Sequence, residues 1–364
     1  MPEYKGALEV YKEEDGYYLV NELKVDDYIA GVIGSEMPTS YGLEAAKVQA
    51  VAARSYALAH QGSTKYAKYG AQVDDTTATQ VYNHIAANEI SLAAAAETSG
   101  EVLEYNDQII SGNFFAASCG STANFGEVWA SLDTYPSNTP IYLVANKQYT
   151  KEDGLDLSNE KDAYTFFTTP PEEIDAFDNG SAWFRWQLDL TKEELEQIIE
   201  SNVYSLLIQH PSLVKVLDEN NEWSNKEITE IGELKNIIVE KRGEGGNIME
   251  LVVEGSKESV KVSTEYLIRN LLAPVQEEPG KEAFSIIRAD GSKVENMSML
   301  PSAFFVVDLQ KDSTGEMDKV TFYGGGFGHG VGMSQEGVKG MVDRGYTYKE
   351  ILQHYYRNIE IDVF

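Results

Sequence analysis

Cysteine, basic residues and long apolar runs are all scarce in this sequence, and each scarcity excludes a class of protein. The single cysteine, Cys119, rules out an intramolecular disulfide but leaves the cellular compartment open. The 364 residues hold 29 Lys and Arg against 59 Asp and Glu, which gives a formal net charge of −30. Because so acidic a chain repels polyphosphates, we expect no nucleic-acid partner and no anionic membrane surface.

Membrane, export and metal signals are missing as well. No apolar run approaches the roughly 18 residues needed to cross a bilayer, so no transmembrane segment is expected in this chain. The first ten residues, MPEYKGALEV, lack the basic and apolar regions of an export signal, and any signal or anchor is expected outside this sequence. The five histidines are dispersed and no Cys-x-x-Cys or His-Glu-x-x-His spacing occurs. We therefore expect no metal and no cofactor, and a lone Cys119 paired with a histidine is a weak candidate nucleophile.

Helical patterns occur near both ends of the chain. Alternating residues within 7–35 predict a hairpin followed by a turn or short helix. Alanines 46, 50, 53 and 57 form a stripe on a helix predicted over 42–60, and a second Ala-rich helix is predicted over 88–97. Two helices close the chain: one follows Ser334 and ends at Gly345, and the other begins at Thr347 with Glu350 completing a capping box.

Short strand patterns fill most of the remainder and indicate an α+β fold, because strands and helices do not alternate regularly. The predicted strands are 79–83, 101–110, 112–118, 236–254 with a turn at GEGG, 302–308 and 318–323. An acidic stretch separates two groups of strands and contains a capping box, Thr191 with Glu194, that opens a helix predicted to reach about Glu200. We predict an N-terminal part of a core at 1–145, an inserted acidic lobe at 146–230 and a C-terminal part of the core at 231–364.

The segment 324–335, GGGFGHGVGMSQ, concentrates glycine more than any other part of the chain. It lacks the Lys-Ser or Lys-Thr of a P-loop and the Gly-x-Gly-x-x-Gly frame of a dinucleotide site. Two interpretations remain. The glycines either shape a buried turn or let the main chain approach a ligand closely.

Glu36 is a candidate acid because of its position between Ser35 and Met37-Pro38, just before the Ala-rich helix. The residues alone favour a simpler interpretation, in which a carboxylate interacts with the N-terminus of that helix. Chemistry at Glu36 rests on a resemblance to a known family.

Several segments, in order along the chain, resemble the stage II sporulation protein D (SpoIID/LytB) family. They lie within about 25–145 and 235–360 and comprise 35–38 (SEMP), 46–57 (AKVQAVAARSYA), 74–76 (DDT), 80–82 (QVY), 98–103 (TSGEVL), 328–335 (GHGVGMSQ) and 354–356 (HYY).

The resemblance implies a soluble peptidoglycan lytic transglycosylase that works outside the cytoplasm, in the cell envelope or secreted. In that family the Glu of the Glu-Met-Pro motif, here Glu36, is the catalytic acid. The expected reaction cleaves the MurNAc–GlcNAc bond of glycan strands and leaves 1,6-anhydro-MurNAc ends. One carboxyl group suffices, because the substrate's own C6 hydroxyl attacks C1, whereas a hydrolase needs two. The residues expected to bind glycan are Arg54, Tyr82, Ser118, Gly120, Thr122, Gly328, His329, Gly330, Ser334 and Gln335.

The chain also departs from the family pattern. Residues 118–122 read SCGST where the family often has Ser-Gly-Gly-x-Thr, and Phe327, Glu336 and Val338 replace residues that are commonly Trp, Trp and Ala. Some relatives hold zinc near 118–122 through Cys and His, but here Cys119 stands alone, so no zinc is expected. The alternative function is a non-catalytic cell-wall-binding module that stimulates a peptidoglycan amidase. A cell-wall amidase or another sporulation hydrolase is the expected protein partner.

Overall fold

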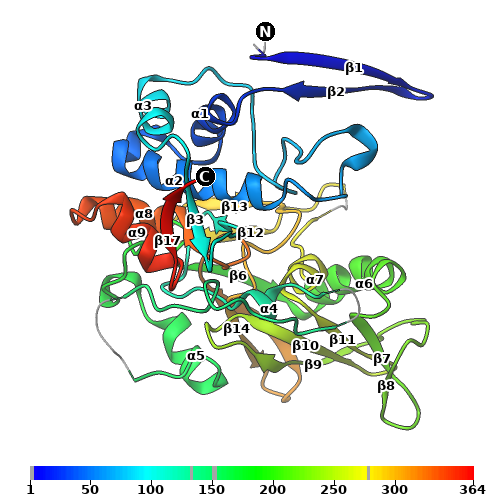
Figure 1. Cartoon of the computed structure of the whole chain (residues 1–364). Helices are drawn as coiled ribbons and strands as arrows, with labels where there is room; N and C mark the ends of the chain where they lie inside the picture. The colour runs from blue at the N-terminus through cyan, green and yellow to red at the C-terminus, as the bar shows by residue number, and fades with distance from the viewer. Residues whose placement is uncertain (1–3, 132–133, 150–153, 277–278) are drawn as a thin grey trace. The chain divides into compact units, whose positions relative to one another are not determined.

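The computed structural model of the chain describes residues 4–131, 134–149, 154–276 and 279–364. Helices and strands mix within them without regular alternation, which confirms the predicted α+β class (Figure 1). The chain forms two compact units. Unit 1 comprises Met1–Phe114 and Val338–Phe364, and unit 2 comprises Phe115–Gly337.

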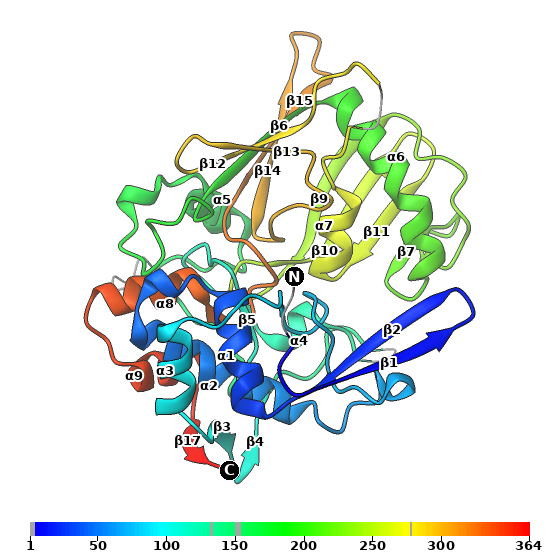
Figure 2. The same cartoon turned by 90° about the horizontal axis from the view of Figure 1, so that it is seen from above.

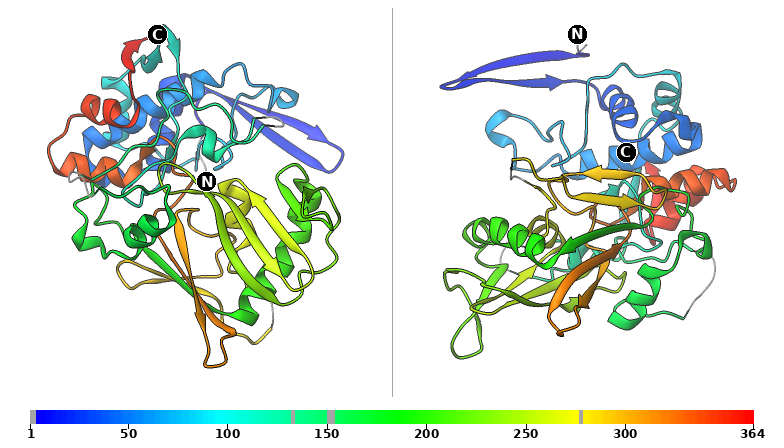
Figure 3. Two further views of the ribbon diagram at one scale, coloured as in Figure 1. Left: turned by 90° about the horizontal axis from the view of Figure 1, so that it is seen from below. Right: turned by 180° about the vertical axis from the view of Figure 1, so that it is seen from behind.

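Unit 1 begins with a two-stranded antiparallel ribbon, as predicted. Strands β1 (Ala7–Glu13) and β2 (Gly16–Glu22) pair along their full length, with Glu13 opposite Gly16 at the tip. The ribbon leads into helix α1 (Val25–Glu36) and extends well beyond it (Figure 3). Because the side chains of a strand alternate between its two faces, one face of the ribbon carries Leu8, Val10 and Leu19 and the other carries Glu9 and Tyr18.

Helix α2 (Leu43–Ala59) is the central element of unit 1 and confirms the predicted Ala-rich helix. It contacts α1, α3 (Glu89–Glu97), α9 (Tyr348–Tyr355) and β3 (Glu101–Tyr105). Residues 48–55 are all buried, and five of these eight residues are alanine or valine, as expected for a helix covered on most sides. Its alanines let α1 and α3 pack closely, and the shared core includes Ile29, Ile33 and Ala94.

The two ends of unit 1 meet in a three-stranded sheet. The predicted strand over 101–110 is a hairpin of β3 and β4 (Gln108–Ile109), joined by Asn106 and Asp107 at positive φ, as a type I′ turn requires. Strand β17 (Glu360–Val363) pairs with the other side of β3. The C-terminal helices are confirmed as α8 (Gln335–Asp343), which begins in unit 2 and ends in unit 1, and α9, whose capping box joins Thr347 and Glu350.

Unit 2 contains two five-stranded sheets that share one hydrophobic core (Figure 2). Their strand orders are β8-β7-β11-β10-β9 and β13-β12-β6-β15-β14. Helix α6 (Lys192–Gln209) contacts strands of both sheets as well as α7 (Glu265–Leu271). The remaining elements are β5 (Phe114–Phe115), α4 (Phe125–Val128), α5 (Glu160–Thr168), β6 (Trp186–Thr191), β7 (Val214–Leu217), β8 (Trp223–Ser224), β9 (Leu234–Arg242), β10 (Ile248–Gly255), β11 (Ser259–Ser263), β12 (Ser285–Arg288), β13 (Lys293–Glu295), β14 (Phe305–Lys311), β15 (Met317–Gly324) and β16 (Met333–Ser334).

The strand predictions in unit 2 are largely confirmed, with differences in length. The pair β9 and β10 reproduces the strands predicted over 236–254, and β14 and β15 reproduce those at 302–308 and 318–323. The capping box of Thr191 and Glu194 opens α6, which continues to Gln209 rather than stopping near Glu200. The strand predicted over 112–118 shrinks to the two residues of β5. Strand β6, from the predicted acidic lobe, pairs with β12 and β15, so it shares a sheet with the following part of the chain.

The strand predicted over 79–83 is wrong. These residues form an irregular segment whose backbone donors bond to side chains and a turn instead of a neighbouring strand. The amide of Val81 donates to Glu36, that of Asn83 to Ser35, and that of Tyr82 to the carbonyl of Asp75.

Candidate functional site

Glu36 is the last residue of α1, seven residues before Leu43, where α2 begins. The predicted placement at a helix N-terminus is therefore wrong, and the motif itself explains why. A residue before proline is biased toward extended backbone, and Met37 has φ −137° and ψ 136° ahead of Pro38. The helix thus ends at Glu36, which lies half-buried at its C-terminal end.

A short hydrogen bond fixes the Glu36 carboxyl group. The backbone N–H of Val81 donates to Glu36 Oε1 at 2.6 Å. Val81 belongs to the irregular segment that sequence patterns assigned to a strand. The family-like residues 80–82 therefore meet the Glu-Met-Pro motif in space, within unit 1.

Asp74 holds the segment that carries Val81. Its Oδ2 accepts from the Tyr66 hydroxyl at 2.6 Å, and its Oδ1 accepts from the Thr79 hydroxyl at 2.7 Å and the Thr76 amide at 3.2 Å. Partial burial alone would raise the pKa of Asp74, but these hydrogen bonds lower it below its ordinary value. Asp74 is therefore a carboxylate at neutral pH and organises the turn between α2 and Val81.

Two tyrosine hydroxyls lie within electrostatic range of Glu36. Burial raises the pKa of Tyr28. The hydrogen bond with Gln80 lowers this pKa and the charge of Glu36 raises it, and the net shift is upward. Burial also raises the pKa of Tyr56, with added contributions from Asp74 and Glu36. Both phenols stay neutral around Glu36. Tyr28 and Glu36 are eight residues apart on one helix and so share a face, a spacing from which the sequence could have identified Tyr28.

A groove of about 1770 Å³ lies in unit 1. The ribbon β1–β2 supplies part of its lining and the segment 66–75 another part. Tyr28, Asp74 and Tyr82 border it, whereas Glu36 is not among the described residues that line it. A smaller depression of about 330 Å³ is lined by uncharged residues, among them Gly34 and Pro38, which flank Glu36 in the sequence.

The other two predicted site residues of unit 1 have different environments. The side chain of Arg54 is fully buried and donates to Asp26 Oδ1 and to the carbonyls of Glu101 and Ala95, which favours a structural role. Tyr82 is half-buried, with its ring stacked on Tyr28 at a centroid distance of 5.6 Å. It borders the groove, so it is placed to contact a ligand.

Ser118 and Ser334 belong to unit 2, where they bind a buried carboxyl group that sequence patterns did not identify. Asp178 Oδ2 accepts from the Ser118 amide at 2.8 Å and from the Ser334 hydroxyl at 3.0 Å. Burial raises the pKa of Asp178 to about 6, although both serines act in the opposite direction. Both serines are themselves buried, so their described contacts are internal to unit 2.

Gly120 and Thr122 also have internal partners. Gly120 has φ +100°, and a Cβ there would contact the ring of Phe166 at 3.3 Å. The Thr122 hydroxyl and the backbone of Asn146 exchange hydrogen bonds at 3.3 and 2.9 Å.

Cys119, just before Gly120, is buried, and burial raises the pKa of its thiol to about 12, which is unsuited to a nucleophile. Among the described residues no group of three or more His, Cys, Asp and Glu is arranged to hold a metal ion.

The glycine-rich segment packs tightly within unit 2. A Cβ on Gly324 would lie 2.3 Å from the Trp186 ring, and one on Gly330 would lie 2.4 Å from the Phe304 ring. Gly328 and Gly330 also have φ of +114° and +82°, which favour glycine. Packing and backbone angle therefore account for these glycines without a ligand.

His329 and Gln335 complete the predicted set. His329 Nδ1 accepts from the Val331 amide at 3.1 Å, and its ring packs against Phe115 and Trp129. Gln335 is buried at the start of α8. Of the predicted site residues, Glu36, Tyr82 and Arg54 thus lie in unit 1, and the others lie in unit 2: Ser118, Gly120, Thr122, Gly328, His329, Gly330, Ser334 and Gln335.

Two family models match the chain. One, described as stage II sporulation protein, matches residues 13–105, which include Glu36 and Val81. The other, a domain of unknown function (DUF8618), matches residues 123–332 and so covers most of unit 2.

Within the described residues, no helix is both long and apolar enough to cross a membrane.

Curated proteins match in the same regions. A Bacillus subtilis protein named amidase enhancer is 28% identical over 341 residues, covering 90% of this chain and 39% of its own length. The stage II sporulation protein D of B. subtilis is 37% identical over 130 residues, covering 32% of this chain and 38% of its own length. An uncharacterized protein of Brachyspira hyodysenteriae is 39% identical over 126 residues, covering 34% of each chain. The chain thus spans well under half of the length of these relatives.

Proposed function

Because the chain belongs to the stage II sporulation protein D family, we propose that it is a peptidoglycan lytic transglycosylase with Glu36 as its acid and base. The substrate would be the glycan strand, and the enzyme would cleave the bond between MurNAc and GlcNAc. Such a substrate implies work outside the cytoplasm, in the cell envelope.

The observation that carries the proposal is the placement of Glu36. The Glu-Met-Pro motif ends α1 at this residue, and the Val81 amide holds its carboxyl group at 2.6 Å. Catalytic carboxyl groups need such fixed geometry, because a small displacement of the carboxyl group lowers the reaction rate strongly. The C-terminal end of a helix carries partial negative charge, which favours the neutral acid over the carboxylate, whereas the Val81 hydrogen bond acts in the other direction.

One carboxyl group is enough for the proposed reaction. The acid form of Glu36 would give its proton to the glycosidic oxygen as the bond from that oxygen to C1 breaks. The C6 hydroxyl of the same MurNAc then bonds to C1 and returns its proton to Glu36. The products are a free GlcNAc 4-hydroxyl and a 1,6-anhydro-MurNAc end, and no water is consumed. Asp74, engaged by three hydrogen bonds, would have a positioning role.

Uncharged surroundings next to Glu36 also suit a glycan backbone. The smaller depression beside Gly34 and Pro38 is lined only by uncharged residues, with Thr39 and Asn88 as hydrogen-bonding groups. Sugars bind through neutral hydrogen bonds and apolar ring faces, for which this lining is appropriate. Tyr82, whose ring lies next to Gly31 of this lining, would add an aromatic face.

A second function is favoured by one specific comparison. The relative that aligns over 90% of this chain is named amidase enhancer. The chain could accordingly act without cleaving glycan, as a wall-binding module that stimulates a peptidoglycan amidase. The proposed partner is then an amidase of the cell wall.

Product analysis separates the two functions. Purified glycan strands, with and without stem peptides, are incubated with the protein and examined by mass spectrometry. Anhydro ends support the transglycosylase, and reducing ends indicate a hydrolase with a second carboxylate. If no cleavage occurs but the protein accelerates peptide release by an added amidase, the stimulating module is supported.

A further inference from the structure

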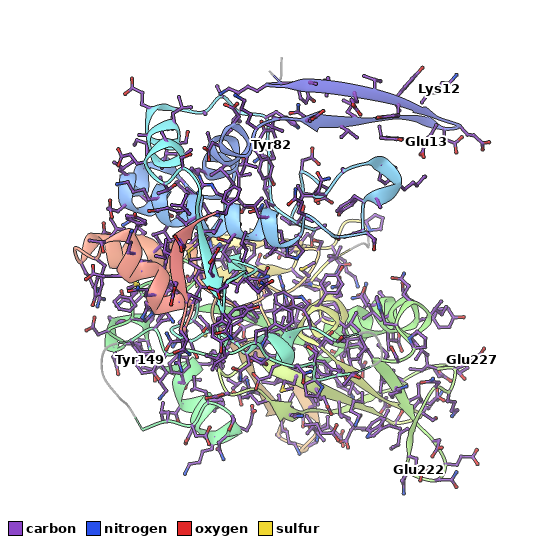
Figure 4. All side chains as sticks on the ribbon, viewed as in Figure 1. Lys12, Glu13, Tyr82, Tyr149, Glu222 and Glu227 are labelled. Carbon is purple, nitrogen blue, oxygen red and sulfur yellow. The ribbon has the colours of Figure 1, made fainter. Side chains whose placement is uncertain are left out.

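The large groove of unit 1 has a chemical character that glycan cleavage does not explain. One wall is the ribbon, where Glu9 lies opposite Val20 and Glu13 lies opposite Gly16. Figure 4 shows Glu13 on the side of the ribbon that faces the segment 66–75 and Lys12 on the other side. The Tyr18 ring meets the Tyr69 ring edge-on at 4.7 Å.

Aromatic and acidic side chains dominate the lining. The tyrosines are Tyr4, Tyr17, Tyr18, Tyr28, Tyr66, Tyr69 and Tyr82. The carboxyl groups are Glu9, Glu13, Glu14, Asp15, Glu22, Asp74 and Asp75. Lys12 is the single lysine among the described lining residues, and no arginine is among them.

This combination favours a cationic ligand. Seven carboxyl groups against one lysine make the groove much more acidic than the chain as a whole, in which acidic residues outnumber basic ones about two to one. A polyanion is repelled by such a surface, and an uncharged glycan gains nothing from it. Lys and Arg side chains bind such a surface through two interactions, because they pair with carboxylates and are attracted to the faces of tyrosine rings.

The chain's own lysines already show this mode of binding at the rim. Lys68 Nζ lies 2.7 Å from Glu13 Oε1 and 5.1 Å from the centroid of the Tyr69 ring. A hydrogen bond to Glu13 raises the pKa of Lys68 above its ordinary value. Lys65 Nζ likewise lies 5.0 Å from the centroid of the Tyr66 ring. A lysine between a carboxylate and a tyrosine face is thus an arrangement that this groove accepts.

The size of the groove points to a polypeptide segment. Its volume of about 1770 Å³ exceeds the roughly 300–1,000 Å³ of pockets that hold small molecules. Its charges are distributed along both strands of the ribbon, so an extended chain can contact several of them in succession.

We propose that the groove between the ribbon β1–β2 and the segment 66–75 is a docking site for an extended, lysine- and arginine-rich segment of another protein. The groove shares Tyr28, Asp74 and Tyr82 with the surroundings of Glu36. The proposal nevertheless does not depend on glycan cleavage, because its test changes only carboxyl groups of the ribbon. It assigns the acidic ribbon a role as a binding arm.

The test uses the full chain and a short synthetic peptide of alternating lysine and serine, with a glutamine–serine peptide of equal length as the neutral probe. Binding is measured by isothermal titration calorimetry at low salt and again at about 300 mM NaCl. The groove variant carries Glu9→Gln, Glu13→Gln and Glu22→Gln. The matched control carries Glu219→Gln, Glu222→Gln and Glu227→Gln, three exposed residues of unit 2.

The lysine peptide should bind, the neutral peptide should not, and salt should weaken binding. The groove variant should lose about tenfold in affinity, whereas the control should stay within about twofold of the wild type. Equal losses in the two variants would mean that net charge alone attracts the peptide and would overturn the proposal. So would the absence of lysine-peptide binding, or binding of an uncharged chitin oligomer that the groove variant abolishes.

A second pair of variants tests the site by gain of affinity. Lys68→Gln frees Glu13 and Tyr69 for the peptide and should tighten binding about threefold. Lys311→Gln removes the same charge from an exposed position of unit 2 and should have a smaller effect. If the two lysine variants behave alike, or if Lys68→Gln weakens binding, the proposed site is wrong.

Discussion

At the scale of single residues, the most informative positions are those where only one residue type fits. Gly330 is such a position in unit 2. Its φ is +82°, and a Cβ would lie 2.4 Å from Cε2 and 2.7 Å from Cζ of Phe304. Gly328, two residues earlier, has a similar constraint from Phe115. The glycine-rich segment is therefore explained by internal packing.

The variant Gly330→Ala should destabilise the protein by about 2–5 kcal/mol, since the added methyl group meets an aromatic ring and the backbone angle is unfavourable. Gly180→Ala is the matched control, because a Cβ there meets nothing within 4 Å. Chemical denaturation followed by circular dichroism measures both. Equal stability of the two variants would remove the packing explanation and leave a ligand as the reason for the glycines.

Asp178 makes stability depend on pH. Its pKa is raised from 3.8 to about 6 by burial, so the folded protein holds this proton more tightly than the unfolded chain does. As pH rises from about 4 to about 6, the unfolded chain loses the proton first and the contribution of Asp178 to stability falls.

The free energy of unfolding of the wild type, measured relative to Asp178→Asn, should therefore decrease between pH 4 and pH 6 and level off above. Urea denaturation at several pH values measures the difference, which is expected to be a few kcal/mol at most. The repulsion among the chain's many other carboxylates is common to both proteins and cancels. A difference that is independent of pH, or that grows with pH, would contradict the account.

At the scale of elements, the segment 74–82 couples the fold to the candidate site. Asp74 accepts three hydrogen bonds that shape this segment, and the segment presents the Val81 amide to Glu36. Under the proposed mechanism, a change in the turn displaces the catalytic carboxyl group without altering its chemistry.

The variant Asp74→Asn should lower kcat for glycan cleavage about 10- to 100-fold with little change in KM or in the thermal unfolding temperature. Asp75→Asn is the neighbouring control, since the Asp75 side chain is 60% exposed, and it should remain within about twofold of the wild type. Steady-state kinetics on purified glycan strands measure both. A loss confined to KM, or equal losses in the two variants, would show that the segment binds substrate rather than positions Glu36.

The same segment shows what sequence patterns could and could not predict. Helices α2, α3 and α9 were predictable because periodic apolar residues and capping residues are local signals. The residues 79–83 have the composition of a strand, but the amides of Val81 and Asn83 bond to the side chains of Glu36 and Ser35, more than 40 residues earlier, which no local pattern reveals. The end of α1 at Glu36 follows from Pro38 and could have been predicted from the sequence.

At the scale of the whole molecule, long-range pairing decides the organisation. The C-terminal strand β17 pairs with β3, so unit 1 is built from both ends of the chain. Strand β6 lies between β12 and β15, which are far away in the sequence. Changes of composition along the chain do not report such pairings, and the predicted boundaries at 145 and 230 remain a prediction. For the candidate site, the family resemblance indicated Glu36 and the helical spacing could have indicated Tyr28, whereas Tyr56 and Asp74 emerged only from the structure.

The central claim is that the carboxyl group of Glu36 cleaves glycan, and the most direct test compares the wild type with Glu36→Gln. Glutamine keeps the shape and can still accept from the Val81 amide, but it cannot donate a proton to the glycosidic oxygen. Glu360→Gln, an exposed position of unit 1, is the control. The products from purified glycan strands are counted by mass spectrometry, and strand binding is measured in parallel. We predict 1,6-anhydro ends from the wild type and Glu360→Gln, and none from Glu36→Gln despite retained binding. Anhydro ends produced by Glu36→Gln at the wild-type rate would contradict the account.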